Sequence, residues 1–104
     1  MNHLPISFDL SVWNLLKKIP KGRVTTYKRI AIALGKPNAA RAVGNACNRN
    51  PNAPKVPCHR VVCSDGSIGG YAKGEKRKIA LLKSEGITIK NNKALLFSKQ
   101  LFEF

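Results

Sequence analysis

A chain of 104 residues, 43% of them hydrophobic, is long enough for one domain with its own core, and no apolar run reaches the roughly 18 residues that would span a membrane. Nineteen Lys and Arg residues against five Asp and Glu give a formal net charge of +14, spread from Lys17 to Lys99, which predicts a polyanionic partner. The N-terminus lacks the pattern of a secretory signal and the three cysteines are an odd number, so we expect a monomeric intracellular protein without a disulfide framework.

The first predicted element is an amphipathic helix. Apolar residues recur at helical spacing from Phe8 to Ile19, with Ser7 placed to cap the first turn. Pro20 and Gly22 follow directly and end the periodic pattern. We therefore expect one helix from Phe8 to Ile19.

Two further helices are predicted before residue 50. The segment RVTTY, at residues 23–27, is short and β-prone, and Thr25 or Thr26 then caps a helix that ends at Leu34. Asn38 is the expected cap of a third helix, AARAVGNACNR. A short turn with glycine and proline separates the two.

Two helices joined in this way indicate a helix-turn-helix. Many small helical domains contain two helices joined by such a turn without binding DNA. Together with the net charge of +14, however, this pattern favours DNA binding. The second helix of the pair offers mainly Ala, Gly and Val, with Arg41 as its one long basic residue near the start. Such a helix is poorly equipped to read bases, and it suits a shallow groove into which one side chain is inserted.

The second half of the chain begins with an irregular segment, NPNAPKVP, in which three prolines remove hydrogen-bond donors. HRVV then predicts a short strand, SDGSIGGY a glycine-rich turn, and EKRKIALLKSEG a helix that closes on Gly86. ITIKNNKALLF predicts a hairpin around Asn91 and Asn92. The predicted fold is mainly α with small β elements, a winged helix-turn-helix-like DNA-binding domain.

The segment VPCHRVV, at residues 56–62, places Cys58 beside His59. A thiol next to an imidazole is a nucleophile, part of a metal site or an ordinary buried cysteine. Zinc is disfavoured because no C-x-x-C is present and because adjacent residues of an extended segment point to opposite sides. A papain-like protease is disfavoured because His3 is the only other histidine.

If His59 activates Cys58, a carboxylate is the natural group to orient the imidazole. Glu85, at the end of a predicted helix, is the preferred candidate. Asp65 lies in a turn, and Glu75 begins a helix whose macrodipole already stabilises its charge.

PCHRVV resembles the active-site motif of the O6-alkylguanine-DNA alkyltransferases, proteins that repair DNA by accepting an alkyl group. Four other landmarks stand in the same order as in that family: VWNLLKKIPKGRVTTYKRIA, ARAVGNACNRNP, GGY and LLKSEG. The resemblance runs from about Phe8 to Gly86. It implies a single domain over residues 1–104, the C-terminal catalytic domain of the family without its N-terminal domain.

The resemblance also implies a reaction, in which an alkyl group, methyl by preference, passes irreversibly from O6-alkylguanine in duplex DNA to Cys58. The nucleotide would be flipped out of the duplex from the minor groove, with no metal or cofactor, and each molecule would act once. His59 would take the thiol proton through a water, and Glu85 would hold His59. Asn50 would brace the turn, and Tyr27 would donate to N3 of the departing guanine.

The contacts with DNA and with the flipped base are implied in the same way. Arg41 would fill the gap that the flipped nucleotide leaves in the base stack. The other expected DNA contacts are Tyr27, Ala39, Ala40, Gly44, Asn45 and Arg60. The expected substrate pocket consists of Cys58, Val61, Gly69, Tyr71 and Ala72, with the carbonyls of Cys58 and Val61 accepting from the guanine amino group. Ala72 stands where many relatives carry serine, and Lys73 stands where a small residue is common.

Two other interpretations remain open. The first is a non-catalytic, alkyltransferase-like sensor of DNA lesions, a class that typically carries a different residue, often tryptophan, at the position of the cysteine. The presence of Cys58 favours transfer over sensing. The second is a helix-turn-helix transcription regulator, which would leave Cys58, His59 and Glu85 without a purpose.

Overall fold

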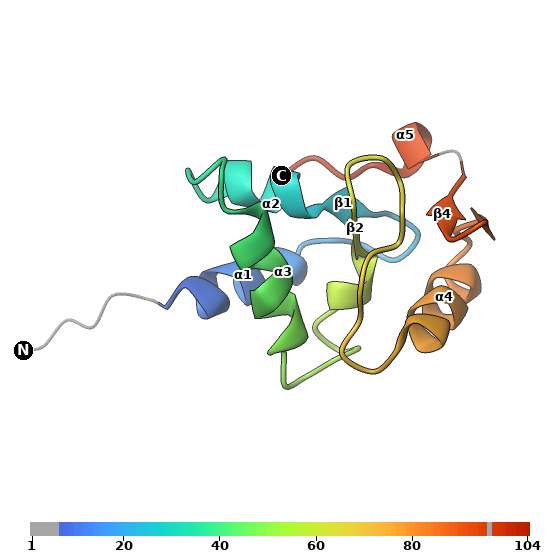
Figure 1. The fold of residues 1–104 in the computed structure, drawn as a ribbon, viewed down its shortest axis with the longest axis horizontal. Coiled ribbons are helices and arrows are strands. Elements are labelled where there is room, and N and C mark those ends of the chain that lie inside the picture. Colours follow the sequence, from blue (N-terminus) through green and yellow to red (C-terminus); the bar gives the residue numbers. More distant parts are fainter. Residues whose placement is uncertain (1–6, 96) are drawn as a thin grey trace, which may run out of the picture.

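The computed structural model describes residues 7–95 and 97–104. In chain order the elements are α1 (Phe8–Leu16), β1 (Thr25–Thr26), α2 (Tyr27–Ala33), α3 (Ala40–Asn48), a 3-10 turn (Cys58–Arg60), β2 (Val61–Val62), α4 (Glu75–Ser84), β3 (Ile89–Lys90), β4 (Lys93–Ala94) and α5 (Phe97–Gln100). Figure 1 shows α1, α2 and α3 on one side, α4 and the β3–β4 hairpin on the other, and β1 and β2 between them. The predicted fold class, mainly α with small β elements, is confirmed.

Helix α1 begins where the sequence predicts and ends earlier. The Ser7 side chain accepts a hydrogen bond from the Leu10 N–H at 3.1 Å, which caps the first turn. After Leu16 the chain tightens into hydrogen bonds of the i→i−3 type, and Ile19 donates to the Leu16 carbonyl at 3.1 Å. This tight turn still carries Ile19 into the core, so the apolar pattern is right although the helix is shorter.

Thr26 ends β1 and caps α2. Its hydroxyl oxygen accepts from the Arg29 N–H at 3.0 Å, which decides between the two caps that the sequence allowed. Strand β1 pairs in parallel with β2, with Thr25 opposite Val61. This pairing sets the start of α2 beside the chain that leaves the 3-10 turn.

Helix α3 starts later than predicted, and Asn38 does not cap it. The residue before the helix is Ala39, and no side chain caps the first turn. A turn closed by the Ala39 N–H donating to the Lys36 carbonyl at 2.9 Å carries the chain past Asn38 before the helix begins. The indole N–H of Trp13 on α1 donates to the Ala46 carbonyl at 2.9 Å and fixes α1 to α3.

Two groups of buried side chains form the core. The helical cluster lies between α1, α2, α3 and the 3-10 turn, and the hairpin cluster joins β2, α4 and the β3–β4 hairpin. The hairpin turns at Asn91 and Asn92, whose φ angles of 52° and 59° confirm the predicted turn. No helix in the described ranges is both long and apolar enough to cross a membrane.

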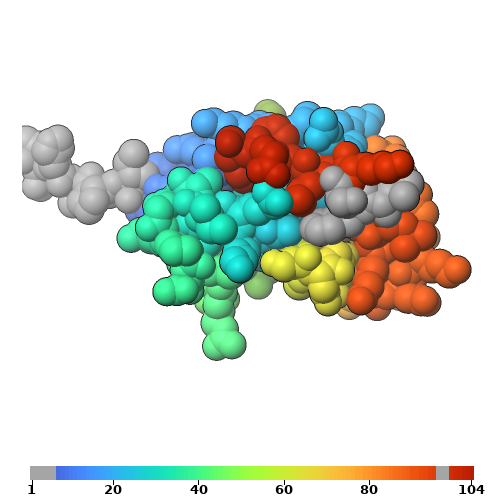
Figure 2. All heavy atoms as spheres, turned by 90° about the horizontal axis from the view of Figure 1, so that it is seen from above, coloured from blue at the N-terminus to red at the C-terminus, as the bar shows by residue number. Residues whose placement is uncertain are grey.

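The last residues of the chain return to the edge of β1, which the sequence did not predict. Val24 donates to the Gln100 carbonyl at 3.0 Å, and Phe102 donates to the Val24 carbonyl at 2.7 Å. Phe102 packs against the helical cluster, and its ring meets that of Phe104 edge to face at 5.2 Å. In Figure 2 this red segment lies across the blue and cyan segments. The tail thus covers backbone that would otherwise be an open strand edge.

We expect Phe102→Ala to lower the free energy of unfolding by about 2 kcal/mol, because a partly buried ring is removed from the core. Phe104→Ala is the matched control, since that ring lies in the same tail and is 43% exposed; we expect a loss of less than about 0.5 kcal/mol. Urea denaturation of both variants measures the difference. Equal losses would contradict the anchoring role of Phe102.

Candidate active site and DNA-binding groove

Cys58 opens the 3-10 turn and lies inside the protein. Its side chain is 3% exposed and belongs to the helical cluster. The predicted strand HRVV is confirmed only for Val61 and Val62, because His59 and Arg60 belong to the turn that Pro57 begins. Cys58 and His59 therefore do not lie in an extended segment, which removes one of the two grounds given above against a zinc site.

The structure offers no metal site in the part of the chain that it describes. Within residues 7–95 and 97–104, no three His, Cys, Asp or Glu side chains gather as metal ligands would. His3, the other histidine weighed for a protease, lies outside the described residues.

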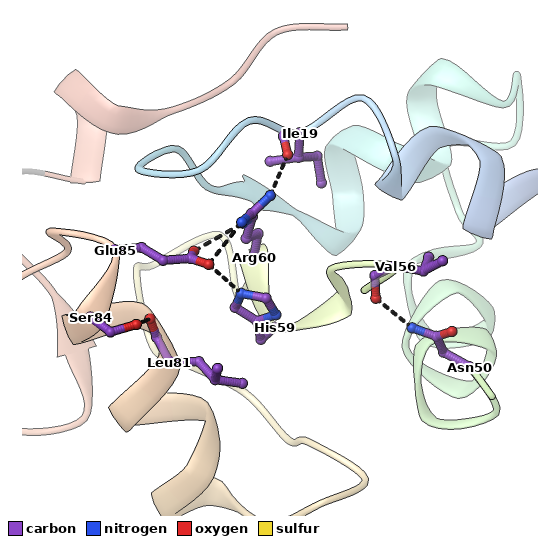
Figure 3. Close-up of polar contacts among 8 residues, drawn as sticks. All are labelled: Ile19, Asn50, Val56, His59, Arg60, Leu81, Ser84 and Glu85. Atoms are coloured by element: carbon purple, nitrogen blue, oxygen red, sulfur yellow. Dashed lines mark hydrogen bonds and ion pairs between the residues drawn. The ribbon is translucent and has the colours of Figure 1, made fainter. Parts of the chain in front are cut away.

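Glu85 holds the imidazole of His59, as the sequence predicted. The two side chains meet at 3.0 Å between Nε2 of His59 and Oε2 of Glu85 (Figure 3). Arg60 fastens the same carboxylate from its other side, with Nε 2.9 Å from Oε1 and Nη2 2.7 Å from Oε2. The remaining guanidinium nitrogen of Arg60, Nη1, donates to the Ile19 carbonyl at 2.8 Å. Glu85 thereby ties the end of α4 to the turn that carries Cys58.

This arrangement fixes the protonation state of His59. Burial raises the pKa of Glu85, but hydrogen bonds from Arg60 and His59 outweigh burial and leave the pKa below its ordinary 4.5. Burial lowers the pKa of His59 below its ordinary 6.5, although Glu85 opposes the shift. Because a carboxylate only accepts hydrogen bonds, Nε2 of the neutral His59 carries the hydrogen. Nδ1 is then a basic lone pair, and it has no hydrogen-bond partner among the residues described.

The Cys58 thiol is protonated at neutral pH. Burial raises its pKa, against a hydrogen bond from the Asn50 side chain and the nearby charges of Lys78 and Lys73. Asn50 also braces the approach to Cys58, since its Nδ2 donates to the Val56 carbonyl at 2.7 Å (Figure 3). The thiol therefore needs a base before it can act as a nucleophile.

A groove of about 510 Å³ runs between α3, the start of α2 and the glycine-rich turn. Its walls contain Tyr27, Lys28, Ala40, Arg41, Gly44, Asn45, Asn48, Cys63, Ser64, Gly69 and Gly70. Figure 2 shows the green α3 and the yellow segment that follows β2 side by side along one edge of the molecule. Five of the residues predicted to contact DNA are thus brought together here: Tyr27, Ala40, Arg41, Gly44 and Asn45.

Two of the predicted DNA contacts lie elsewhere. Ala39 lines a separate hollow with Phe8 and Leu34. Arg60 uses its guanidinium on Glu85 and on the Ile19 carbonyl and does not line the groove, and its contact with DNA stays a prediction.

Tyr27 and Gly69 meet inside the groove. A Cβ atom at Gly69 would lie 2.8 Å from the Tyr27 hydroxyl oxygen, and the Gly69 φ of +71° independently disfavours any side chain. Because Gly69 has no side chain, the Tyr27 hydroxyl has room inside the groove. Gly69 is the one member of the predicted substrate pocket that lines this groove.

The other predicted pocket residues do not line the groove. Cys58 and Val61 are buried, and the Val61 carbonyl already accepts a hydrogen bond from Lys78 at 2.7 Å. Tyr71 is partly buried, with its ring edge-on to His59 at 6.4 Å. Ala72 is exposed on the following turn.

Two residues of this region were not predicted from the sequence. Cys63 was given no task, and it lines the groove. Lys78 was taken as part of a helix and is fully buried, 0% exposed. A signal for Lys78 was present, because it stands four residues before the apolar Leu82 and seven before Glu85, on one face of α4.

Comparison with known proteins shows that this chain belongs to the 6-O-methylguanine DNA methyltransferase family. Residues 7–87 match the family model described as "6-O-methylguanine DNA methyltransferase, DNA binding domain". The chain is 56% identical over 78 residues to the methylated-DNA–protein-cysteine methyltransferase of Methanosarcina barkeri. The aligned region covers 75% of this chain and 49% of that protein. The chain spans about half the length of the curated relatives it matches first.

Solved structures agree with this match. Mycobacterium tuberculosis OGT in complex with DNA superposes with a TM-score of 0.75 at 46% identity, over 79% of this chain and 51% of that one. S. pombe Atl1, in complex with damaged DNA containing O6-carboxymethylguanine, superposes with a TM-score of 0.79 at 31% identity, over 93% of this chain and 95% of that one. The expectation of a C-terminal catalytic domain alone is corrected by the family model, which describes a DNA-binding domain.

The His59–Glu85 pair predicts a pH dependence of stability. Folding lowers the pKa of His59 below 6.5, so the unfolded chain binds a proton that the folded chain does not, and the free energy of unfolding falls as the pH drops through that range. The free energy of unfolding falls a second time below pH 4.5, because folding lowers the pKa of Glu85 and the unfolded chain takes up this proton first. We expect His59→Gln to remove the first loss and keep the second in urea denaturation across this pH range. Parallel curves for both proteins above 4.5 would contradict the assignment.

Proposed function

Since this chain belongs to the 6-O-methylguanine DNA methyltransferase family through its DNA-binding domain, we propose that it repairs duplex DNA by transferring a methyl group from guanine O6 to its own Cys58. The observation that carries the proposal is the state of His59. Its Nε2 is held by Glu85 at 3.0 Å, and its Nδ1 is buried, basic and without a partner among the described residues. A neutral imidazole held in this way can act as a general base for the protonated thiol of the neighbouring residue.

The proposed step moves one methyl group and one proton. The thiol proton of Cys58 passes through a water to Nδ1 of His59, and the thiolate attacks the methyl carbon. The S–C bond forms as the C–O6 bond breaks, and the electron pair of that bond stays on the guanine. Tyr27 donates to N3 of the departing base, so that it leaves neutral; the proton on His59 then returns to Tyr27 through solvent. The thioether is stable, so each molecule acts once.

The groove is suited to hold the DNA from which the base is flipped. It is lined by small residues of α3 that let a sugar-phosphate backbone come close, with Arg41 exposed on the same helix. A net charge of +14 supplies the attraction for phosphates that offsets the cost of flipping.

A weak contact joins two segments near Cys58 in the sequence. Lys73 donates to the Ala53 carbonyl at 2.9 Å and so joins the turn after Tyr71 to the segment before Cys58. This contact is exposed, and a hydrogen bond of this kind contributes about 1 kcal/mol. Separation of the two segments is therefore inexpensive beside the binding energy of a DNA duplex.

A second candidate function is the recognition of alkylated guanine without transfer. The likeness to S. pombe Atl1 favours it, because it extends over 93% of this chain and 95% of that one, and because Atl1 binds damaged DNA containing O6-carboxymethylguanine. Burial of Cys58 outside the groove agrees with this candidate. The two functions differ in whether the protein gains a methyl group.

Mass spectrometry of the intact chain after mixing with a methylated duplex decides between them. We expect the native protein and Cys63→Ala to gain one methyl group in place of the thiol hydrogen. Cys58→Ala should gain none and still bind the duplex, because the thiol contributes little to DNA contact. Binding without any methyl gain in the native protein would establish the sensor. A gain in Cys58→Ala would reassign the nucleophile.

Arg41→Ala tests the flipping step. We expect transfer from duplex DNA to slow about tenfold, since a side chain that fills the gap in the base stack is lost. Transfer from the free base O6-methylguanine should change less than about twofold, because no stack is opened. Lys83→Ala, which removes the same charge outside the groove, is the control for duplex rates. Equal losses of Arg41→Ala on both substrates would remove the proposed role.

A further inference from the structure

Arg29 and Glu103 form an ion pair that the proposed reaction does not use. One guanidinium nitrogen of Arg29, Nη1, donates to both carboxylate oxygens of Glu103, at 2.5 Å and 2.6 Å. Arg29 belongs to α2, and Glu103 belongs to the tail that returns to the edge of β1. Figures 1 and 2 both show the end of this red tail beside α2. The ion pair thus joins the tail to the helix that begins with Tyr27.

A second hollow adjoins the DNA-binding groove on the side of this ion pair. It encloses about 390 Å³, and Arg29 is one of its walls. Lys28 and Ser64 line both this hollow and the groove, so the two share a border. Arg29 also lines a third hollow, which contains Glu103. The Arg29 side chain therefore lies between the carboxylate of the tail and the surface that leads to the groove.

The contact between Arg29 and Glu103 is open to exchange. The Glu103 side chain is 71% exposed, whereas that of Glu85 in its pair with Arg60 is 10% exposed. Arg60 gives two nitrogens to its carboxylate, and Arg29 gives one. An exposed ion pair contributes little to stability, because water solvates both charges and salt screens them. Another anion can therefore replace Glu103 on Arg29 at low cost.

A DNA phosphate is an anion that fits this guanidinium. Arginine is charged at every physiological pH, and its planar donors match the oxygens of a phosphate as well as those of a carboxylate. Nε and Nη2 of Arg29 make no hydrogen bond within the residues that the structure describes, so they can meet a second anion. A duplex in the groove would carry its backbone past Lys28 and Ser64, which border the hollow that Arg29 lines.

We propose that Arg29 is a DNA-phosphate contact at the edge of the groove, and that Glu103 occupies it in the free protein until a phosphate takes its place. The inference rests on the proposed function, because it takes the groove as the site of the duplex. No covalent bond changes, since one anion replaces another on the guanidinium. The tail then lowers the affinity for every duplex, damaged or not, and so favours release of DNA that needs no repair.

The first experiment measures the affinity for an undamaged, fluorescently labelled duplex by anisotropy. We expect Glu103→Gln to tighten binding about threefold, the size of an exposed ion pair that no longer competes. The same substitution in an Arg29→Gln background should change the affinity less than about 1.5-fold, because the competition needs both partners. Glu75→Gln is the matched control, since it removes an exposed carboxylate from the start of α4, and it should change the affinity less than about 1.5-fold. Equal gains from Glu103→Gln with and without Arg29 would overturn the inference.

The second experiment measures how the affinity depends on salt. Each phosphate contact contributes about −0.9 to the slope of log K against log salt for duplex DNA. Arg29→Gln should therefore make the slope shallower by about 0.9, and Lys83→Gln, which removes an exposed cation outside the groove, should keep the native slope. A native slope in Arg29→Gln would overturn the phosphate contact.

The exchange of partners is observed directly in the native chain labelled with 13C-glutamate. The side-chain carboxylate resonance of Glu103, assigned by its absence from Glu103→Gln, should shift when the duplex is added and move toward its position in Arg29→Gln. The resonance of Glu75 should stay in place. A Glu103 resonance that does not move in the DNA complex would show that the pair stays closed, and it would overturn the inference.

These readouts separate the inference from the proposed function, because they use binding to undamaged DNA and not transfer. A protein that gains one methyl group while Arg29→Gln keeps the native salt slope retains the proposed function and loses this inference. A protein that shows the expected slopes and the Glu103 shift but gains no methyl group loses the proposed transfer and keeps Arg29 as a phosphate contact.

Discussion

Two charged side chains on one face of α4 hold the rest of the site together. Glu85 and Lys78 are seven residues apart, two helical turns, so both project from the same side of the helix. Glu85 accepts hydrogen bonds from His59 and Arg60 on the 3-10 turn, and Lys78 donates one to the hydroxyl of Tyr27, which lines the groove. The placement of His59 relative to Tyr27 is therefore set by the packing of a single helix.

Both groups are stable in the interior because their partners are charged or hydrogen-bonded. The Glu85 carboxylate accepts from His59 and from two nitrogens of Arg60, and the Lys78 ammonium faces three oxygens. Removal of one partner would leave a buried charge that costs more than the pair contributed. Substitutions along this face of α4 should therefore impair folding and the geometry of the site together.

The sequence predicted those parts of the site that local patterns determine. The threonine that begins α2 places Tyr27 in its first turn, and the small residues of α3 flank Arg41, so these groove residues follow from helix periodicity. Glu85 was predicted because few carboxylates were available to orient His59. The spacing of Lys78 from Leu82 and Glu85 places it on this face of α4, but the acceptors that allow its burial come from three separate segments and leave no local pattern. The return of the tail to β1 likewise depends on a pairing between Val24 and Leu101 that leaves no periodic signal.

Burial of Cys58 has two consequences for the proposed reaction, in which each molecule acts once. A thiol with a raised pKa in a closed core is a poor target for oxidants and for stray electrophiles, because reactivity follows thiolate character and exposure. In the proposed reaction, the same burial makes the thiol dependent on the His59–Glu85 pair for deprotonation. In the proposed reaction the Cys58 thiol thus stays unreacted until a flipped base gains access to it. A permanently exposed thiolate would react faster with every alkylating agent and be consumed before it met damaged DNA.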